Sequence, residues 1–213
     1  MGQRTKSFTN YSNFSRSWSG YSCFFTTRQE RKDRQREKIE SQPKLIMEYE
    51  PNAYPDIYCP AKSYSVGIGN WLNRKFLRIA IRNEGRGVAN QCTARLRIIM
   101  DKNDNFSPSL EPKTLLWESM STVEDIGVRN HAILDVIFSD SMEGREKKAF
   151  VSTPFNLEEK NLINPLTKDG FHIGNYTFEL EVRTIDGFSV KNNFKIHVTD
   201  KWDEISMEEI DSP

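Results

Sequence analysis

Hydrophobic and polar residues alternate with a period of two along much of the chain after residue 44. In NYTFELEVRT an aromatic or aliphatic side chain occupies every second position from Tyr176 to Val182, and polar residues fill the positions between. The stretches KLIMEYE, FLRIAIRN, CTARLRIIM, AILDVIF and VKNNFKIHV show the same alternation. Successive side chains of a β-strand point to opposite faces of the sheet, so each stretch predicts a strand with one buried and one solvated face.

Residues 44–200 are therefore expected to fold as a single antiparallel β-sandwich. LLWE at 115–118 and KAFVST around 148–153 add short strands, and no helical period longer than a turn or two occurs in this range. Seven or eight short strands separated by turn residues are typical of an all-β, immunoglobulin-like sandwich. The hydrophobic content of 37% is enough for a core, which Trp71 and Trp117 are expected to fill or to cap at its ends.

Three further segments flank the predicted sandwich. Residues 1–27 are rich in Ser, Thr, Asn and Arg and contain no Asp or Glu, which predicts a disordered basic arm. Residues 28–43 alternate acids and bases in RQERKDRQREKIE, which predicts a short charged helical linker that ends before Pro43. Residues 201–213 form an acidic tail that is expected to fray.

The formal net charge of zero is unevenly distributed along the chain. Residues 1–43 hold nine Lys and Arg against four Asp and Glu, a net charge of +5. The other 170 residues hold 21 Lys and Arg against 26 Asp and Glu, a net charge of −5. A basic arm on an acidic body indicates an interaction segment more than it indicates catalysis.

Aromatic residues recur through the basic arm. From Tyr11 to Phe25 the rings are spaced by 3, 4, 3 and 4 residues, which would place them on one face of a helix. Three interpretations remain open: a disordered linker, a membrane-surface segment at residues 8–25, and an organelle transit peptide. No apolar run is long enough to span a membrane and no secretory leader is evident, so the predicted location is cytoplasmic, with peripheral membrane contact through residues 8–25 as an option.

The glycines of NEGRGVAN decide whether the chain carries a nucleotide site. A phosphate-binding loop joins a strand to a helix, because the phosphate is held at the helix N-terminus. Gly85 and Gly87 are followed instead by the strand pattern of CTARLRIIM, with no third glycine and no Lys-Ser/Thr pair. The segment is therefore predicted to be a corner between adjacent strands, in which both glycines supply positive φ angles.

No catalytic or metal-binding constellation is evident in the sequence. The three histidines, at positions 131, 172 and 197, are far apart and lack ligand spacing. DKNDN at 101–105 matches the start of a calcium loop but is followed by Phe106 and Pro112 where Gly and Glu are required. Three scattered cysteines fit free thiols better than a zinc site or a disulfide framework. The sequence therefore predicts a protein that is not an enzyme, with no metal, cofactor or small-molecule substrate.

Four arginines form the main candidate binding surface. Arg78 and Arg82 occupy polar positions of FLRIAIRN. Arg95 and Arg97 occupy polar positions of CTARLRIIM. If the two strands form one hairpin, the four side chains share its outer face as a basic stripe that suits an acidic partner. No aromatic residue is interleaved on that face, so nucleic acid is not expected there, and the alternative is cross-strand pairing with the glutamates of NYTFELEVRT.

Several short motifs follow one another in a recurring order. RNEG and GVAN join two predicted strands, VEDIGVRNHAILDVIF places a polar turn before an apolar strand, and FHIGNYTFELEV and VKNNFKIHV come after it. Over residues 75–199 this order resembles CARDB-type modules, which are immunoglobulin-like sandwiches of bacterial and archaeal proteins. The segments between Met100 and His131 and at 139–174 are longer than in that pattern. The resemblance implies a prokaryotic, non-catalytic adhesion or interaction module, and it transfers no catalytic residue.

The sequence as a whole favours a non-catalytic interaction module that binds a protein or acidic partner and that is displayed at a membrane surface if the arm inserts. The expected contacts are the four arginines of the predicted stripe. The rival interpretation is an accessory domain of an enzyme system that binds a carbohydrate or an anion. A row of exposed aromatic side chains would favour the carbohydrate, whereas the arginine stripe favours the anion.

Overall fold

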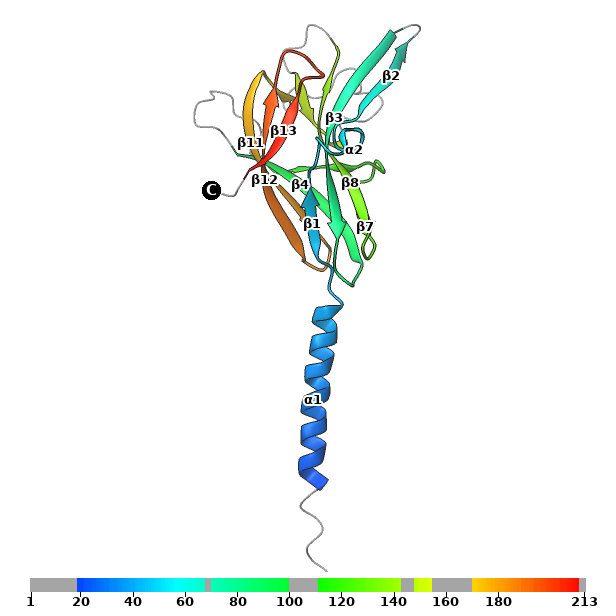
Figure 1. Cartoon of the computed structure of the whole chain (residues 1–213), viewed down its shortest axis with the longest axis vertical. Coiled ribbons are helices and arrows are strands. Elements are labelled where there is room, and N and C mark those ends of the chain that lie inside the picture. Colours follow the sequence, from blue (N-terminus) through cyan, green and yellow to red (C-terminus); the bar gives the residue numbers. More distant parts are fainter. Residues whose placement is uncertain (1–18, 68–69, 100–110, 143–147, 155–169, 211–213) are drawn as a thin grey trace, which may run out of the picture. The chain divides into compact units, whose positions relative to one another are not determined.

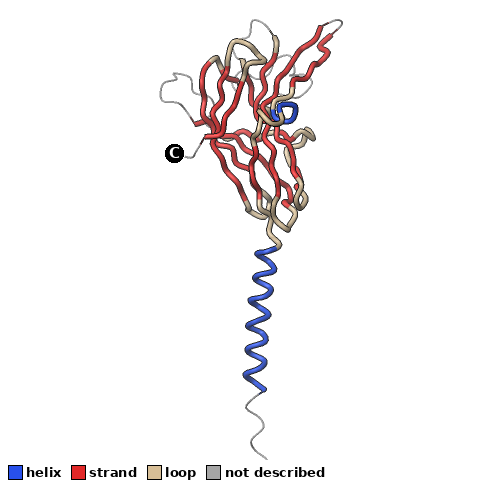
Figure 2. Tube along the Cα trace, in the orientation of Figure 1, coloured by secondary structure: helices blue, strands red, loops and turns tan. Residues whose placement is uncertain are grey.

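The computed structural model describes residues 19–67, 70–99, 111–142, 148–154 and 170–210. The chain divides into two compact units, Met1–Ser41 and Gln42–Pro213. The division lies close to the predicted start of the sandwich at residue 44. Figures 1 and 2 show a helix in the first unit and a strand-rich second unit.

The described part of the first unit is a single helix, α1 (Ser19–Glu40). It covers residues 28–40 of the charged linker predicted at 28–43, but it begins well before residue 28, so the predicted disorder is wrong for residues 19–27. Extending a helix fixes one residue for each new hydrogen bond and costs far less than nucleating one, so the charged segment can propagate its helix backwards. Every side chain from Gln29 to Glu40 is exposed. No helix among the described residues is long and apolar enough to cross a membrane.

The second unit is a sandwich of two antiparallel sheets, as predicted. The seven-stranded sheet contains β1 (Leu45–Glu48), β2 (Ala61–Gly67), β3 (Asn70–Asn83), β6 (Leu116–Trp117), β8 (His131–Asp140), β9 (Ala149–Val151) and β10 (Gly170–Phe171). The six-stranded sheet contains β4 (Ala89–Ile99), β5 (Lys113–Thr114), β7 (Glu124–Ile126), β11 (Gly174–Arg183), β12 (Ser189–Val198) and β13 (Ser206–Ile210). A short helix, α2 (Pro55–Tyr58), lies between β1 and β2 in the chain. The strand number exceeds the predicted seven or eight because several strands have only two or three residues.

The strand order agrees with the immunoglobulin-like class. In the seven-stranded sheet β3 pairs with β1 and β8, and β8 pairs with β6; in the six-stranded sheet β11 lies between β12 and β4. These neighbours correspond to the ABED and GFC strands of immunoglobulin domains. At the start of β11 the Tyr176 hydroxyl donates to the carbonyl of His172 at 3.3 Å, which is the hydrogen bond of a tyrosine corner.

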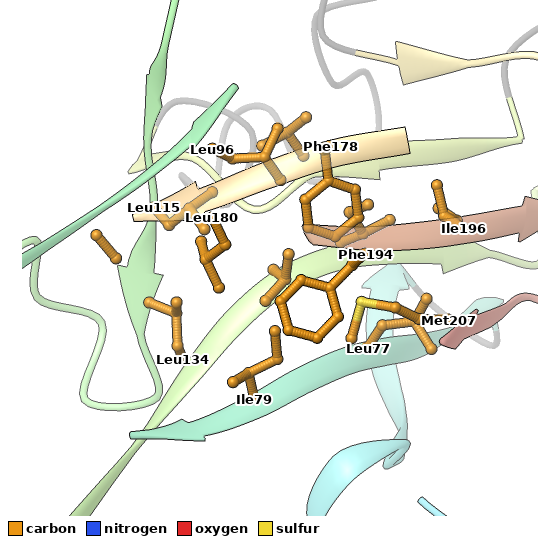
Figure 3. Close-up of a cluster of buried hydrophobic side chains, with 14 of the residues drawn as sticks. Leu77, Ile79, Leu96, Leu115, Leu134, Phe178, Leu180, Phe194, Ile196 and Met207 are labelled. Carbon is orange, nitrogen blue, oxygen red and sulfur yellow. The ribbon is translucent and has the colours of Figure 1, made fainter. Parts of the chain in front are cut away.

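The core lies between the two sheets. Figure 3 shows apolar side chains of the seven-stranded sheet, such as Leu77, Ile79 and Leu134, facing those of the six-stranded sheet, such as Leu96, Phe178 and Phe194. Trp117 is buried, and its indole N–H donates to the carbonyl of Cys92 at 3.2 Å. The prediction that Trp71 fills or caps the core is wrong, because its side chain is 66% exposed.

The corner between β3 and β4 carries the chain from one sheet to the other. The prediction that Gly85 and Gly87 have positive φ angles is wrong, because in the described part of the chain the glycines with positive φ are Gly174 and Gly187. Gly85 is required for a different reason, because a Cβ atom there would overlap the carbonyl oxygen of Gln42 and the backbone nitrogen of Lys44. Close approach of two backbones is the second circumstance that favours glycine.

The side chain of Asn83 fastens this corner. Its Oδ1 accepts from the backbone N–H groups of Lys44 at 3.1 Å and Gly85 at 3.0 Å. Its Nδ2 donates to the carbonyls of Gly87 at 2.7 Å and Ile126 at 3.1 Å. An amide side chain offers two donors and two acceptor positions, so this buried asparagine is fully satisfied.

The C-terminal segment is not a frayed tail over most of its length. β13 pairs along β12, with Met207 opposite Ile196 and Glu208 opposite Lys195. Ile205 and Met207 are buried, because the alternation in EISMEEI places apolar side chains on the core side. Residues 211–213 lie outside the described residues.

Replacing Gly85 with alanine is expected to lower the free energy of unfolding by about 2–3 kcal/mol, because the new methyl group must displace the backbone of residues 42–44. Gly127→Ala is the control, since the nearest atom to its Cβ is 3.7 Å away, and its effect should stay within about 1 kcal/mol. Urea unfolding followed by circular dichroism measures both. Equal stability of the two variants would contradict the close approach at Gly85.

Candidate interaction surface

The four arginines of the predicted stripe do not share a face. β3, which carries Arg78 and Arg82, belongs to the seven-stranded sheet, whereas β4, which carries Arg95 and Arg97, belongs to the six-stranded sheet. The prediction of one hairpin with a common outer face is therefore wrong. The alternation of a strand fixes which side chains share a face, but it does not say whether the next strand stays in the same sheet.

Arg78 is a structural residue on the outer face of the seven-stranded sheet. Its side chain is 4% exposed, and its Nε lies 2.6 Å from Oδ1 of Asp135. Its Nη1 donates to Oε1 of Glu118 at 2.8 Å. Burial raises the pKa of Asp135, and the positive charge of Arg78 opposes that rise. A buried arginine held by two carboxylates is not available to a partner protein.

A second buried arginine, Arg74, lies on the same face and was not singled out from the sequence. Its side chain is fully buried, with Nη2 at 3.6 Å from Oδ2 of Asp140. The guanidinium also lies 4.3 Å from the ring centre of Phe138 and 5.6 Å from that of Tyr64. Aromatic faces attract cations, so these rings stabilise the buried charge.

These arginines accompany a small apolar cluster outside the main core. Its buried members are Phe76, Leu116, Phe138 and Phe150. The sequence signal for this cluster is Phe76, which the alternation of FLRIAIRN assigns to the solvated face. Phe138 has the spacing of the core residues Leu134 and Val136, and the register irregularity of β8 opposite Leu77 and Arg78 places it on the outer face instead. Part of the outer face of the seven-stranded sheet is therefore buried, so a charged residue on that face can be buried as well.

Arg82 is exposed but already neutralised. Its Nη2 lies 2.8 Å from a carboxylate oxygen of Glu48 and 2.8 Å from one of Glu84. Glu84 also pairs with Lys44 at 3.2 Å. The arginine thus belongs to a surface ion-pair network beside the β3–β4 corner.

Arg95 and Arg97 are the exposed members of the predicted set that form no ion pair in the described part of the chain. Both side chains are exposed on the outer face of the six-stranded sheet, opposite Glu181 and Glu179 of β11. Those glutamates pair elsewhere, because Lys191 lies 3.4 Å from Glu179 and 3.8 Å from Glu181. Within the described residues neither Arg95 nor Arg97 forms an ion pair.

This outer face, termed the arginine face below, carries an excess of positive charge. Its registered positions hold five cations, Arg95, Arg97, Arg183, Lys191 and Lys195, and three anions, Glu179, Glu181 and Glu208. The excess of two positive charges contrasts with the net −5 of residues 44–213. The arginine face is therefore a locally basic surface on an acidic unit.

A hollow of about 350 Å³ on β11, β12 and β13 overlaps the arginine face at Lys195 and Glu208. Its lining consists of Asn175, Lys195, His197, Ser206, Met207 and Glu208. Nδ1 of His197 lies 2.9 Å from Oδ1 of Asn175, and Nζ of Lys195 lies 3.6 Å from Oε1 of Glu208. The hollow offers polar and charged groups, and its lining contains no Phe, Tyr or Trp ring among the described residues.

The described residues contain no group of three or more His, Cys, Asp and Glu side chains that could hold a metal ion. Cys59 and Cys92 are free thiols. Burial raises the pKa of Cys92 to about 11, so this thiol is not an activated nucleophile. The calcium-like stretch at 101–105 lies outside the described residues.

Comparisons with known proteins find no match among protein-family models, curated proteins or solved structures. The resemblance of residues 75–199 to CARDB-type modules therefore stays a prediction.

Replacing Arg78 with alanine is expected to lower the free energy of unfolding by about 3–5 kcal/mol, because it leaves the buried carboxylate of Asp135 without its partner. Arg82→Ala on the same strand removes only exposed ion pairs and should cost about 1 kcal/mol or less. Chemical denaturation of both variants gives the comparison. Two effects of similar size would show that the structure misplaces these arginines.

Proposed function

We propose that this protein is a non-catalytic interaction module that binds an acidic protein partner through the arginine face, with Arg95 and Arg97 as its principal contacts. The observation that carries the proposal is that two neighbouring guanidinium groups are exposed and have no ion pair in the described structure, while the nearby glutamates are paired to other cations. An interaction role of this kind is also what the resemblance to prokaryotic CARDB-type modules implies.

The geometry of the pair suits an extended acidic segment. Arg95 and Arg97 are two residues apart on one strand, and that spacing is about 7 Å. Alternate side chains of an extended partner segment have the same spacing, so two of its carboxylates can meet the two guanidiniums together. A guanidinium presents a planar fork of donors that bonds both oxygens of a carboxylate, which gives direction as well as charge attraction.

The rival proposal, an accessory domain that binds an anionic ligand, is favoured by one observation. The hollow that overlaps the arginine face brings Lys195, His197 and Ser206 together in a space of about 350 Å³. Because its described lining contains no Phe, Tyr or Trp ring, it suits an anion better than a carbohydrate, which usually stacks on such rings.

Charge reversal of the pair tests the main proposal. Titrating the ¹⁵N-labelled protein with a capped peptide of alternating Glu and Ser should shift the backbone amides of residues 93–98, and added salt should weaken the binding. Arg95→Glu/Arg97→Glu should reduce the affinity at least about tenfold, because two attractive contacts become repulsive. Lys44→Glu/Lys201→Glu has the same change in net charge at two exposed positions and serves as the control.

Binding that is lost equally in both double variants would mean that only net charge matters, and the arginine face would be abandoned as the site. Binding of inorganic phosphate with shifts confined to residues 195–208 would favour the rival proposal instead.

Membrane contact through residues 8–25 remains a prediction, because residues 1–18 lie outside the described residues. Co-sedimentation of the full chain with vesicles containing about 30% phosphatidylserine should remove the protein from solution. Phe14→Ser/Trp18→Ser should abolish sedimentation, since it removes two rings of the aromatic series. Sedimentation that does not depend on these rings would leave only a charge effect of the basic arm.

A further inference from the structure

The strand β2 presents an open edge. It pairs with β3 on one side, and no strand within the described residues pairs with its other side. Ala61, Lys62, Ser63 and Ser65 are exposed. Figure 1 shows β2 and the first part of β3 extending as a two-stranded ribbon away from the two sheets. An open edge of this length is a template for pairing with another extended chain.

The hydrogen-bonding pattern between β2 and β3 shows which backbone groups of β2 are not bonded to β3. Residues of β2 and β3 pair in register from Ala61 with Lys75 to Ser65 with Trp71, and the N–H of Phe76 donates to the carbonyl of Pro60 at 3.0 Å. Hydrogen-bonded and non-hydrogen-bonded pairs alternate in an antiparallel ladder. Ala61, Ser63 and Ser65 therefore belong to non-hydrogen-bonded pairs, and their N–H and C=O groups point away from β3.

The positive charge of the ribbon favours a negatively charged partner strand. The sequence from Ala61 to Lys75 contains no Asp or Glu. Within the described residues, the ammonium groups of Lys62 and Lys75 form no ion pair. Lys62 lies 5.7 Å from the ring centre of Phe76, and its charge opposes the rise that burial causes in the pKa of Asp135. Lys75 donates to the carbonyl of Asp203 at 2.6 Å. Lys75 lies opposite Ala61 and Lys62 lies opposite Arg74, so one lysine lies on each face of the ribbon. Arg74 is buried and paired with Asp140, which leaves the two lysines as the accessible charges.

Trp71 adds an apolar contact next to the edge. It is opposite Ser65 and is 66% exposed. A side chain of an added strand at the level of Ser65 would lie two strand spacings away, about 10 Å, with only a serine between them. A large apolar side chain can bridge that gap, and Trp is enriched at protein interfaces.

We propose that the edge from Ala61 to Ser65 binds an extended acidic segment of a partner protein by strand addition, with an apolar side chain of that segment against Trp71. The register irregularity between Ser65 and Gly67 ends the usable edge. A second copy of β2 is disfavoured as the occupant, because two lysine-bearing edges would repel each other. This site is separate from Arg95 and Arg97, which belong to the other sheet.

The probe is a capped eight-residue peptide of alternating Glu and Val, titrated into the ¹⁵N-labelled full chain. Binding should shift the amides of residues 61–65 and the indole of Trp71, and should slow hydrogen exchange of the amides of Ala61, Ser63 and Ser65. Ser63→Pro removes one outward N–H without removing a bond to β3, and should weaken binding at least tenfold. Ser63→Ala is the matched control and should bind within twofold of the parent, although it loses the hydroxyl bond to Asn73.

A second test modifies the peptide and not the protein, so its result does not depend on whether the Ser63→Pro variant folds. N-methylation of every second amide of the peptide should abolish binding when it blocks the pairing edge and preserve it when it blocks the opposite edge. Equal binding of the two methylated peptides, or parental affinity of Ser63→Pro, would overturn the proposal. So would equal affinity for a Lys-Val peptide, or concentration-dependent shifts of residues 61–65 without peptide, which would indicate a second copy.

Arg95→Glu/Arg97→Glu separates the two proposed surfaces. This variant should bind the Glu-Val peptide at residues 61–65 with unchanged affinity. Peptide-induced shifts confined to residues 93–98 would overturn strand addition while leaving the proposed function intact.

Discussion

The buried side-chain amide of Asn83 is the interaction on which the arrangement of the sandwich depends. It bonds four backbone groups from the entry to β1, the β3–β4 corner and the end of β7. A buried polar group left without partners costs free energy, so each of these bonds helps to hold the corner in one conformation. Gly85 completes the constraint by letting the backbone of residues 42–44 pass close to the corner. The chain therefore leaves β3 in one sheet and enters β4 in the other.

That change of sheet determines what the charged residues can do. Arginines that are close in the sequence are placed on two outer faces with different surroundings. On the seven-stranded sheet, Arg74 and Arg78 lie among phenylalanines and carboxylates and are buried. On the six-stranded sheet, Arg95 and Arg97 are exposed, and the neighbouring glutamates are paired with Lys191 and Arg183. The same residue type thus stabilises the fold on one face and is available for binding on the other.

The sequence was sufficient for the strands but not for their assignment to sheets. Alternation located β3, β4, β8, β11 and β12 and most side chains that face the core, because the period of a strand is a local property. It failed at Ile137 and Phe138, where the register irregularity of β8 exchanges the two faces. Whether Gly85 and Gly87 join strands of one sheet or of two depends on contacts with residues 42–44, which no local pattern records. The same reasoning explains Trp71, whose size predicts burial, whereas its position on the ribbon leaves it exposed.

The candidate site was predictable only in part for a related reason. Alternation marks Arg78 and Arg95 equally as solvated positions, and it could not identify the buried carboxylate of Asp135 that binds Arg78. The acidic C-terminal segment was expected to fray because of its composition, although Ile205 and Met207 already had strand spacing. The polarity of a position therefore predicted burial correctly on faces that are wholly buried or wholly solvated. It failed on the outer face of the seven-stranded sheet, where a second apolar cluster buries some of the positions.

Hydrogen exchange of the arginine side chains is the most direct test of the division between buried and exposed arginines. The Nε–H of each arginine can be followed separately by ¹⁵N NMR. The structure requires slow exchange at Arg74 and Arg78, which are almost fully buried, and fast exchange at Arg95 and Arg97. Comparable fast exchange at all four positions would contradict the burial of Arg74 and Arg78, and with it the division between structural arginines on one sheet and available arginines on the other.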